Sequence, residues 1–147
     1  AFQTYDFDIS FEISDSLTIL KDRLLIMQQN MSADIFFKVW STLAQRLNDY
    51  IVEQVLTRHH FTVGGAFQFK HDMQALFLLF SPYTPHPENY FKDLKEILIL
   101  VTLPKDDVGA IMDALDKDRA TLEKTLQKYD IYKLSATQLD VLLNLLL

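Results

Sequence analysis

Apolar residues recur every three to four positions along most of this chain, which is the spacing of one face of an α-helix. Polar and charged residues fill the intervening positions, and residues that cap or end helices stand between the periodic stretches. We therefore predict helices over 15–29, 32–59, 66–80 and 87–103, one that begins at Pro104, one that carries Leu122, Leu126 and Tyr129, and a last one from Ser135.

Local residue preferences place the ends of these helices. Ser32 can accept a hydrogen bond from a first-turn amide, and Ser135 with Gln138 matches a capping box. Pro87 stands where a first helical residue tolerates proline. Residues 62–65 contain two glycines, and we expect this segment to be non-helical and to separate two helices.

The first residues of the chain fit two interpretations. Phe7, Ile9, Phe11 and Ile13 alternate with acidic or polar residues, as in a half-buried strand. We expect either extended chain here or an upstream continuation of the first helix.

Each predicted helix has an apolar face that would turn toward a shared core. We assign to these faces Leu17, Leu20, Leu24 and Met27; Phe36, Val39 or Trp40, Leu43, Leu47, Tyr50, Ile51 and Val55; Phe69, Met73, Leu76, Phe77 and Phe80; Tyr90, Phe91, Leu94, Ile97, Leu98 and Val101; Val108, Ile111, Met112 and Leu115; and Leu139, Leu142, Leu143 and Leu146.

The composition favours a helical fold with one core. Three Gly and four Pro are too few for the many tight turns of a β-sandwich or barrel. A hydrophobic fraction of 49% supplies enough apolar material for a domain of this size. The predicted fold class is all-α, a stacked antiparallel bundle of six to seven helices in which residues 1–147 form a single domain. Both chain ends look abrupt, so we expect the C-terminal part of a larger protein.

Charge and residue usage exclude several classes of function. The net charge of −6 works against nucleic-acid binding, which draws on clustered Lys and Arg. The absence of Cys excludes disulfides and thiolate chemistry. No apolar run reaches the roughly 18 to 20 residues that a membrane-spanning helix needs.

Candidate chemical sites each have a structural explanation. His59 and His60 are adjacent, so they point about 100° apart on a helix, and His71 and His86 stand alone. We expect no catalytic residue, no metal site and no cofactor, and therefore no enzyme. The more prominent carboxylates are expected on solvated outer faces: Glu88, Asp93, Glu96, Asp113, Asp116 and Asp118.

An ordered set of segments resembles the C-terminal region of the Rint/Tip family of vesicle-tethering subunits. The segments are Gly-Gly-Ala-Phe-Gln-Phe-Lys-His-Asp-Met at 64–73, the apolar pairs within 76–80, Pro-Glu-Asn-Tyr-Phe-Lys at 87–92, and the ending at 131–134 and 140–145. The resemblance implies the tip of a helical rod of the CATCHR-like type.

The resemblance also implies a function. Rint/Tip proteins are subunits of the Dsl complex in yeast and the NRZ complex in animals, which receive Golgi-derived retrograde vesicles at the cytosolic face of the endoplasmic reticulum. The implied partners are other tether subunits and SNARE proteins. One alternative is a peripheral membrane or phosphoinositide contact through Lys21, Arg23, Lys92, Lys95 and Lys133, which the overall negative charge opposes. Another is a purely structural end-cap of the rod.

The residues that carry the resemblance are expected to be chiefly structural. Gly65 and Ala66 would form a tight interhelical turn, while Gln68 and Asp72, four apart, could bond to each other. The other residues of this set are Phe69, Met73, Pro87, Tyr90 and Phe91.

The loop over 81–86 is the candidate contact surface, because it is the longest predicted connection. Its candidate contact residues are Ser81, Tyr83 and His86, and we expect Tyr83 and His86 to point outward.

Overall fold

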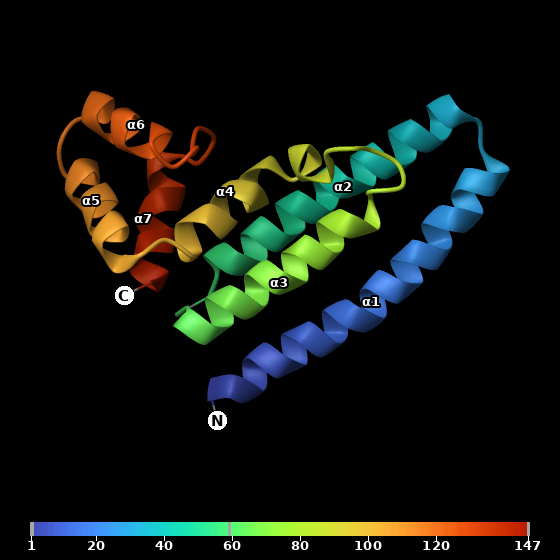
Figure 1. Cartoon of the computed structure of the whole chain (residues 1–147), viewed down its shortest axis with the longest axis horizontal. Coiled ribbons are helices and arrows are strands. Elements are labelled where there is room, and N and C mark those ends of the chain that lie inside the picture. Colours follow the sequence, from blue (N-terminus) through green and yellow to red (C-terminus); the bar gives the residue numbers. More distant parts are fainter. Residues whose placement is uncertain (1, 59, 147) are drawn as a thin grey trace.

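The computed structural model describes residues 2–58 and 60–146, and the side chains of residues 14–58 and 60–146. Within these residues the fold is all-α, with no strand, as the sequence predicted (Figure 1). The elements are α1 (Phe2–Asn30), α2 (Ala33–Leu56), α3 (Val63–Leu79), a 3₁₀ turn η1 (Pro87–Tyr90), α4 (Lys92–Val101), α5 (Lys105–Leu115), α6 (Arg119–Gln127) and α7 (Ala136–Leu145).

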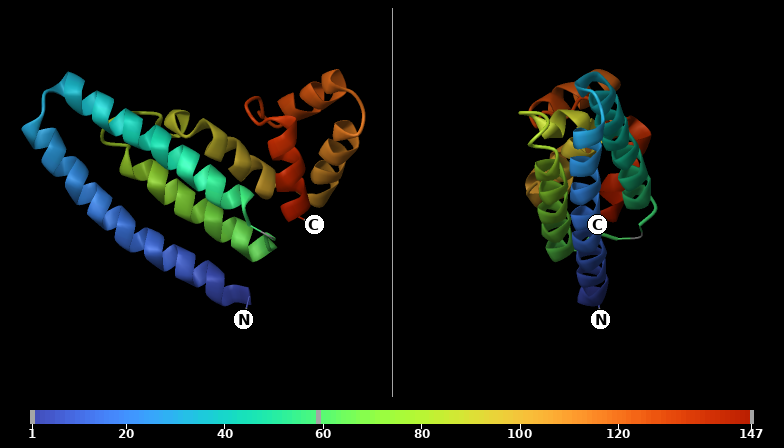
Figure 2. Two further views of the ribbon diagram at one scale, coloured as in Figure 1. Left: turned by 180° about the vertical axis from the view of Figure 1, so that it is seen from behind. Right: turned by 90° about the vertical axis from the view of Figure 1, so that its right-hand side faces the viewer.

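The molecule has two parts. Helices α1 to α4 with η1 run alongside one another and are called here the long-helix layer, and the short helices α5 to α7 form a C-terminal lobe at one end of it (Figures 1 and 2). Within the layer, α1 lies mainly against α3, and α2 lies mainly against α4. The neighbouring helices α1 and α2 are joined by a tight turn and run antiparallel, as expected.

Several of the expected helix boundaries change. Helix α1 extends upstream to Phe2, so of the two expectations for the first residues the helix is right for the backbone. The side chains of Phe7, Ile9, Phe11 and Ile13 lie outside the described part. The expected helix over 87–103 is split into η1 and α4, because Phe91 between them has a non-helical backbone, at φ −127° and ψ 52°.

Residues 62–65 begin a helix instead of breaking the chain. The Thr62 hydroxyl accepts a hydrogen bond from the Gly65 amide at 2.8 Å, which satisfies a first-turn donor of α3. Gly65 and Ala66 are buried in this first turn and form no interhelical turn. The expected caps elsewhere are present, since the Ser32 hydroxyl accepts from the Ile35 amide and Ser135 forms a reciprocal capping box with Gln138.

Helix α2 buries part of the predicted stripe, since Phe36, Trp40 and Val55 are buried as expected. Its buried residues follow a spacing of four from Phe36 to Val52, whereas Tyr50 is 56% exposed. The predicted Leu43, Leu47 and Ile51 are only half-buried. Because α2 has α4 on one side and α1 on another, it needs two apolar faces. The buried stripe consists of Phe36, Trp40, Ala44, Asn48, Val52 and Val55.

Aromatic rings fill the centre of the layer. The rings of Phe77 on α3 and of Phe80, which caps its C-terminal end, lie 4.9 Å and 5.6 Å from the ring of Phe91, measured between centroids. The Trp40 ring lies 4.8 Å from that of Tyr90. Such pairs stabilise beyond the area that they bury, and the predicted apolar faces of α3 and α4 are confirmed as core.

The chain leaves α6 through a residue with a left-handed backbone conformation. Asp130 has φ 60°, and its amide donates to the Gln127 carbonyl while the Ile131 amide donates to the Leu126 carbonyl. This is the Schellman pattern that ends a helix. It turns Ile131 into the core, where 1% of that residue is exposed.

Candidate functional site

The buried carboxylate of Glu96 connects α4 to the C-terminal lobe. Glu96 is 6% exposed, which corrects the expectation that it lies on an outer face. Its two oxygens accept hydrogen bonds from the amides of Tyr132, Lys133 and Leu134 at 2.8–3.0 Å. Three consecutive donors surround the charge and compensate its burial. Glu96 therefore orders the segment between α6 and α7, and its oxygens are occupied by the backbone.

Asn48 plays a matching part at the first turn of α4. This residue of α2 is 1% exposed, and its carbonyl oxygen accepts a hydrogen bond from the Leu94 amide at 3.2 Å. Its side-chain nitrogen donates to Asp49 and, at 3.4 Å, to Asp93. Because Phe91 offers no side-chain cap, a residue from another helix satisfies a first-turn amide of α4.

Sequence analysis missed both of these polar anchors. A signal for Asn48 existed, since it continues the spacing of four from Trp40 through Ala44 to Val52. Glu96 had a weaker signal, its position directly before Ile97 and Leu98 in the most apolar stretch of its helix.

The residues that carry the family resemblance lie mostly inside the fold. Gln68 donates through its side-chain amide to Asp72 at 3.0 Å, as predicted. Tyr90 is half-buried. The remaining members are buried, namely Gly65, Ala66, Phe69, Asp72, Met73, Pro87 and Phe91.

The loop over 81–86 presents its residues in different directions. Tyr83 does not point outward: its ring packs edge-on against Phe36 at 5.0 Å, and burial raises the pKa of its hydroxyl. An aromatic ring beside two apolar helices gains more from packing than from water. Ser81 is exposed and donates to the Leu78 carbonyl. His86 is exposed as expected, with Nδ1 3.5 Å from a carboxylate oxygen of Glu88.

An apolar groove of about 740 Å³ lies between α3 and α4 and is closed at one end by the 81–86 loop. We call it the α3–α4 groove. Phe77 and Leu98 are buried at its base. Leu78 is 67% exposed on the α3 wall, and Ile99 is half-buried on the α4 wall. Lys70, Ser81, Pro85, Glu88, Lys95 and Leu103 also line it.

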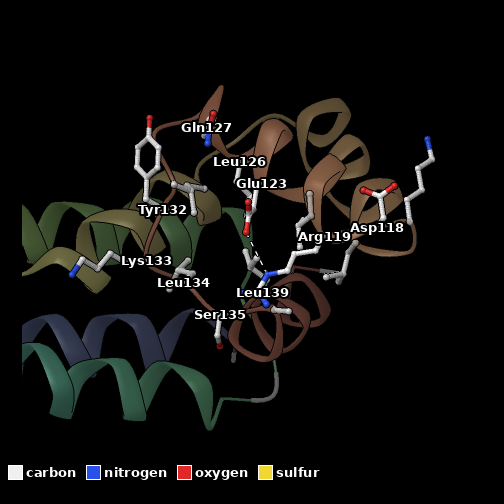
Figure 3. Close-up of a pocket in the computed structure, with 15 residues that line it drawn as sticks. Asp118, Arg119, Glu123, Leu126, Gln127, Tyr132, Lys133, Leu134, Ser135 and Leu139 are labelled. Atoms are coloured by element: carbon white, nitrogen blue, oxygen red, sulfur yellow. Dashed lines mark hydrogen bonds and ion pairs between the residues drawn. The ribbon is translucent and has the colours of Figure 1, made fainter.

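Further hollows lie elsewhere in the described part of the chain. One, of about 720 Å³, lies between α6 and α7, with a base that includes Leu122, Leu126 and Leu139 (Figure 3). In its lining, Arg119 pairs with Glu123 at 3.3 Å, and Asp118 accepts from the Thr121 amide, which lowers the pKa of the Asp118 carboxyl. Another, of about 490 Å³, lies between α1, α2 and α3. A third, of about 630 Å³, is lined by residues of α3 and α5 that include Phe67, Val108 and Met112.

The described residues contain no group of three or more His, Asp or Glu side chains placed to hold a metal ion. His59, one of the adjacent pair, lies outside the described residues. None of the helices in the described ranges is long and apolar enough to cross a bilayer.

Comparison with known proteins gives a consistent relationship. The sequence model of the RINT-1/TIP-1 family matches residues 2–145. The chain is 27% identical over 110 residues to the RINT1-like protein of Drosophila melanogaster, and the aligned region covers 74% of this chain and 15% of that protein. It is 26% identical over 113 residues to the RINT1-like protein MAG2 of Arabidopsis thaliana, and the aligned region covers 76% of this chain and 14% of that protein. The chain thus spans about one-seventh of these relatives. No solved structure matches it.

Proposed function

Because the chain belongs to the RINT-1/TIP-1 family, we propose that it is a non-catalytic C-terminal module of a multisubunit tethering complex. It acts in retrograde transport of vesicles from the Golgi to the endoplasmic reticulum, at the cytosolic face of that membrane. It works through protein–protein contacts with tether subunits and SNARE proteins.

The observation that carries this proposal is the match of the family to almost the whole chain, from residue 2 to 145. The surface supports it, because apolar residues such as Val63, Phe67 and Leu78 are more than half exposed. Exposed apolar surface beside grooves is typical of binding modules. The buried side chains of Asn48 and Glu96 both accept hydrogen bonds from backbone amides, which gives each of them a structural role.

The test uses cells in which the full-length protein is replaced by a variant that lacks residues 1–147 of this chain. We expect return of a Golgi-to-endoplasmic-reticulum reporter cargo to fall severely, while the remaining protein stays at normal abundance. Normal transport with all partner interactions intact would contradict the proposal and would favour a structural end-cap.

A further inference from the structure

We propose that the α3–α4 groove binds an amphipathic helix of a partner protein that carries acidic residues beside its apolar face. This inference rests on the proposed function, because it names the site and the chemistry of one protein contact.

The apolar part of the groove suits a helix. Its two walls come from antiparallel helices, and a third helix packs well into the trough between two others. Leu78 projects from one wall with 67% of its surface exposed, and half-buried Ile99 and Leu103 continue the apolar strip along the other side. A partner side chain placed between them would remove apolar surface from water on both walls.

The charged part of the groove selects an acidic partner. Lys70 lies on the α3 wall and Lys95 on the α4 wall, and neither forms an ion pair with a carboxylate in the described part of the chain. The acidic residue of the lining, Glu88, already has His86 beside it. The lining has two lysines against one carboxylate, so the groove carries net positive charge although the whole chain carries −6. Complementary charge governs partner choice more than affinity.

The length of the groove sets the size of the partner segment. The α4 wall is ten residues long, which corresponds to roughly 15 Å of helix. About three turns of a partner helix fill it, with apolar residues at i, i+3 or i+4, and i+7 facing Leu78 and Ile99. Glutamate or aspartate at the flanking positions then reaches the two lysines.

The experiment uses two stapled helical peptides of about 15 residues, long enough to be helical. Both carry the same leucine stripe, and the flanking positions are glutamate in one and lysine in the other. Binding to the 147-residue chain is measured by fluorescence anisotropy, and contact at the groove is located from amide NMR shifts. We expect the glutamate peptide to bind at least about tenfold more tightly than the lysine peptide, with shifts at Leu78 and Ile99.

Charge reversal in the chain provides the decisive arm. The double variant Lys70→Glu/Lys95→Glu should lose about tenfold in affinity for the glutamate peptide and gain affinity for the lysine peptide. The matched control Lys21→Glu/Lys38→Glu makes the same change of charge at exposed sites outside the groove, and we expect it to leave the preference unchanged. Leu78→Ser should weaken both peptides, because it removes exposed apolar surface without opening the core.

Three outcomes would overturn the inference. They are equal binding of both peptides, an unchanged preference in the charge-reversed variant, and shifts confined to another hollow. A separate measurement uses phosphatidylcholine vesicles with and without phosphatidylserine. If Lys70→Glu/Lys95→Glu abolishes vesicle binding and leaves peptide binding intact, the lysines serve a membrane and the partner proposed here is wrong.

The two proposals can fail separately. If the full-length protein with the charge-reversed groove supports normal retrograde transport while deletion of the chain stops it, the groove inference is lost and the tethering function stands. If deletion has no effect but the peptides bind as expected, the groove is a binding site and the tethering function is lost.

Discussion

The long-helix layer and the C-terminal lobe are held by different kinds of contact. In the layer, the rings of Trp40 on α2 and Phe77 on α3 meet Phe80, at the end of α3, and Phe91, directly before α4, and both Phe80 and Phe91 are fully buried. The lobe meets the layer through hydrogen bonds as well, with Glu96 bound to three amides and the Phe61 amide donating to the Leu145 carbonyl at 2.8 Å.

The difference shows how each part obtains its precision. Apolar contact is non-directional, so a layer of rings tolerates small shifts between helices. A carboxylate that receives three amides fixes both the position and the direction of a segment, because hydrogen bonds weaken steeply away from linear geometry. The lobe is made of short helices of nine to eleven residues, which have little stability alone. Directional bonds compensate for that shortness.

The largest expected effect comes from removing a ring in the layer. Phe80→Ala leaves a cavity beside Trp40 and Phe91, and we expect the free energy of unfolding to fall by about 4 kcal/mol. Urea denaturation monitored by circular dichroism measures the loss. The control Leu78→Ala lies two residues away at an exposed position and should change stability by less than about 0.5 kcal/mol. Equal losses for the two variants would mean that the rings are not the core of the layer.

The next effect tests the connection of the lobe. Glu96→Ala leaves the amides of Tyr132, Lys133 and Leu134 without their acceptor, and we expect a loss of about 3 kcal/mol. Hydrogen exchange should accelerate first at these three amides, ahead of α2 and α3. Glu96→Gln keeps one acceptor oxygen and should lose less. Uniform acceleration across the whole chain would contradict a local role for the carboxylate.

The smallest of the three effects tests the cap that α2 provides to α4. Asn48→Ala removes the acceptor of the Leu94 amide, and we expect a loss of about 2 kcal/mol. The exposed Gln45, one turn earlier on α2, bonds only to its neighbour Asp49 among the described contacts and serves as the control. Slower exchange at Leu94 in Asn48→Ala than in the wild type would be incompatible with this cap.

Most of the fold could be predicted because a helix with one apolar face has apolar residues every three to four positions in the sequence. The faces of α3 and α4 were predicted residue by residue, from Phe69 to Phe80 and from Tyr90 to Val101, and the structure buries all of them except Tyr90, which is half-buried. The capping box at Ser135 was predictable because it depends on residues three positions apart.

The remaining features depend on contacts between distant segments. The prediction for α2 missed Ala44 and Asn48 because they do not look apolar enough to be core, yet a small residue and a satisfied amide let α4 approach. Tyr83 was expected outward because loops are usually exposed, but Phe36 lies 47 positions earlier in the chain and sequence spacing cannot bring the two together. Glu96 was expected in water because its three donors lie more than 35 positions later.

The contact between Glu96 and the 132–134 segment also depends on a single dihedral angle, the positive φ of Asp130. Only glycine, asparagine and aspartate adopt that backbone region at low cost. A valine or isoleucine there would force the chain to leave α6 in another direction, and the amides at 132–134 would then miss the Glu96 carboxylate. The local chirality of one surface residue therefore decides whether a docking event between two distant segments of the chain can take place.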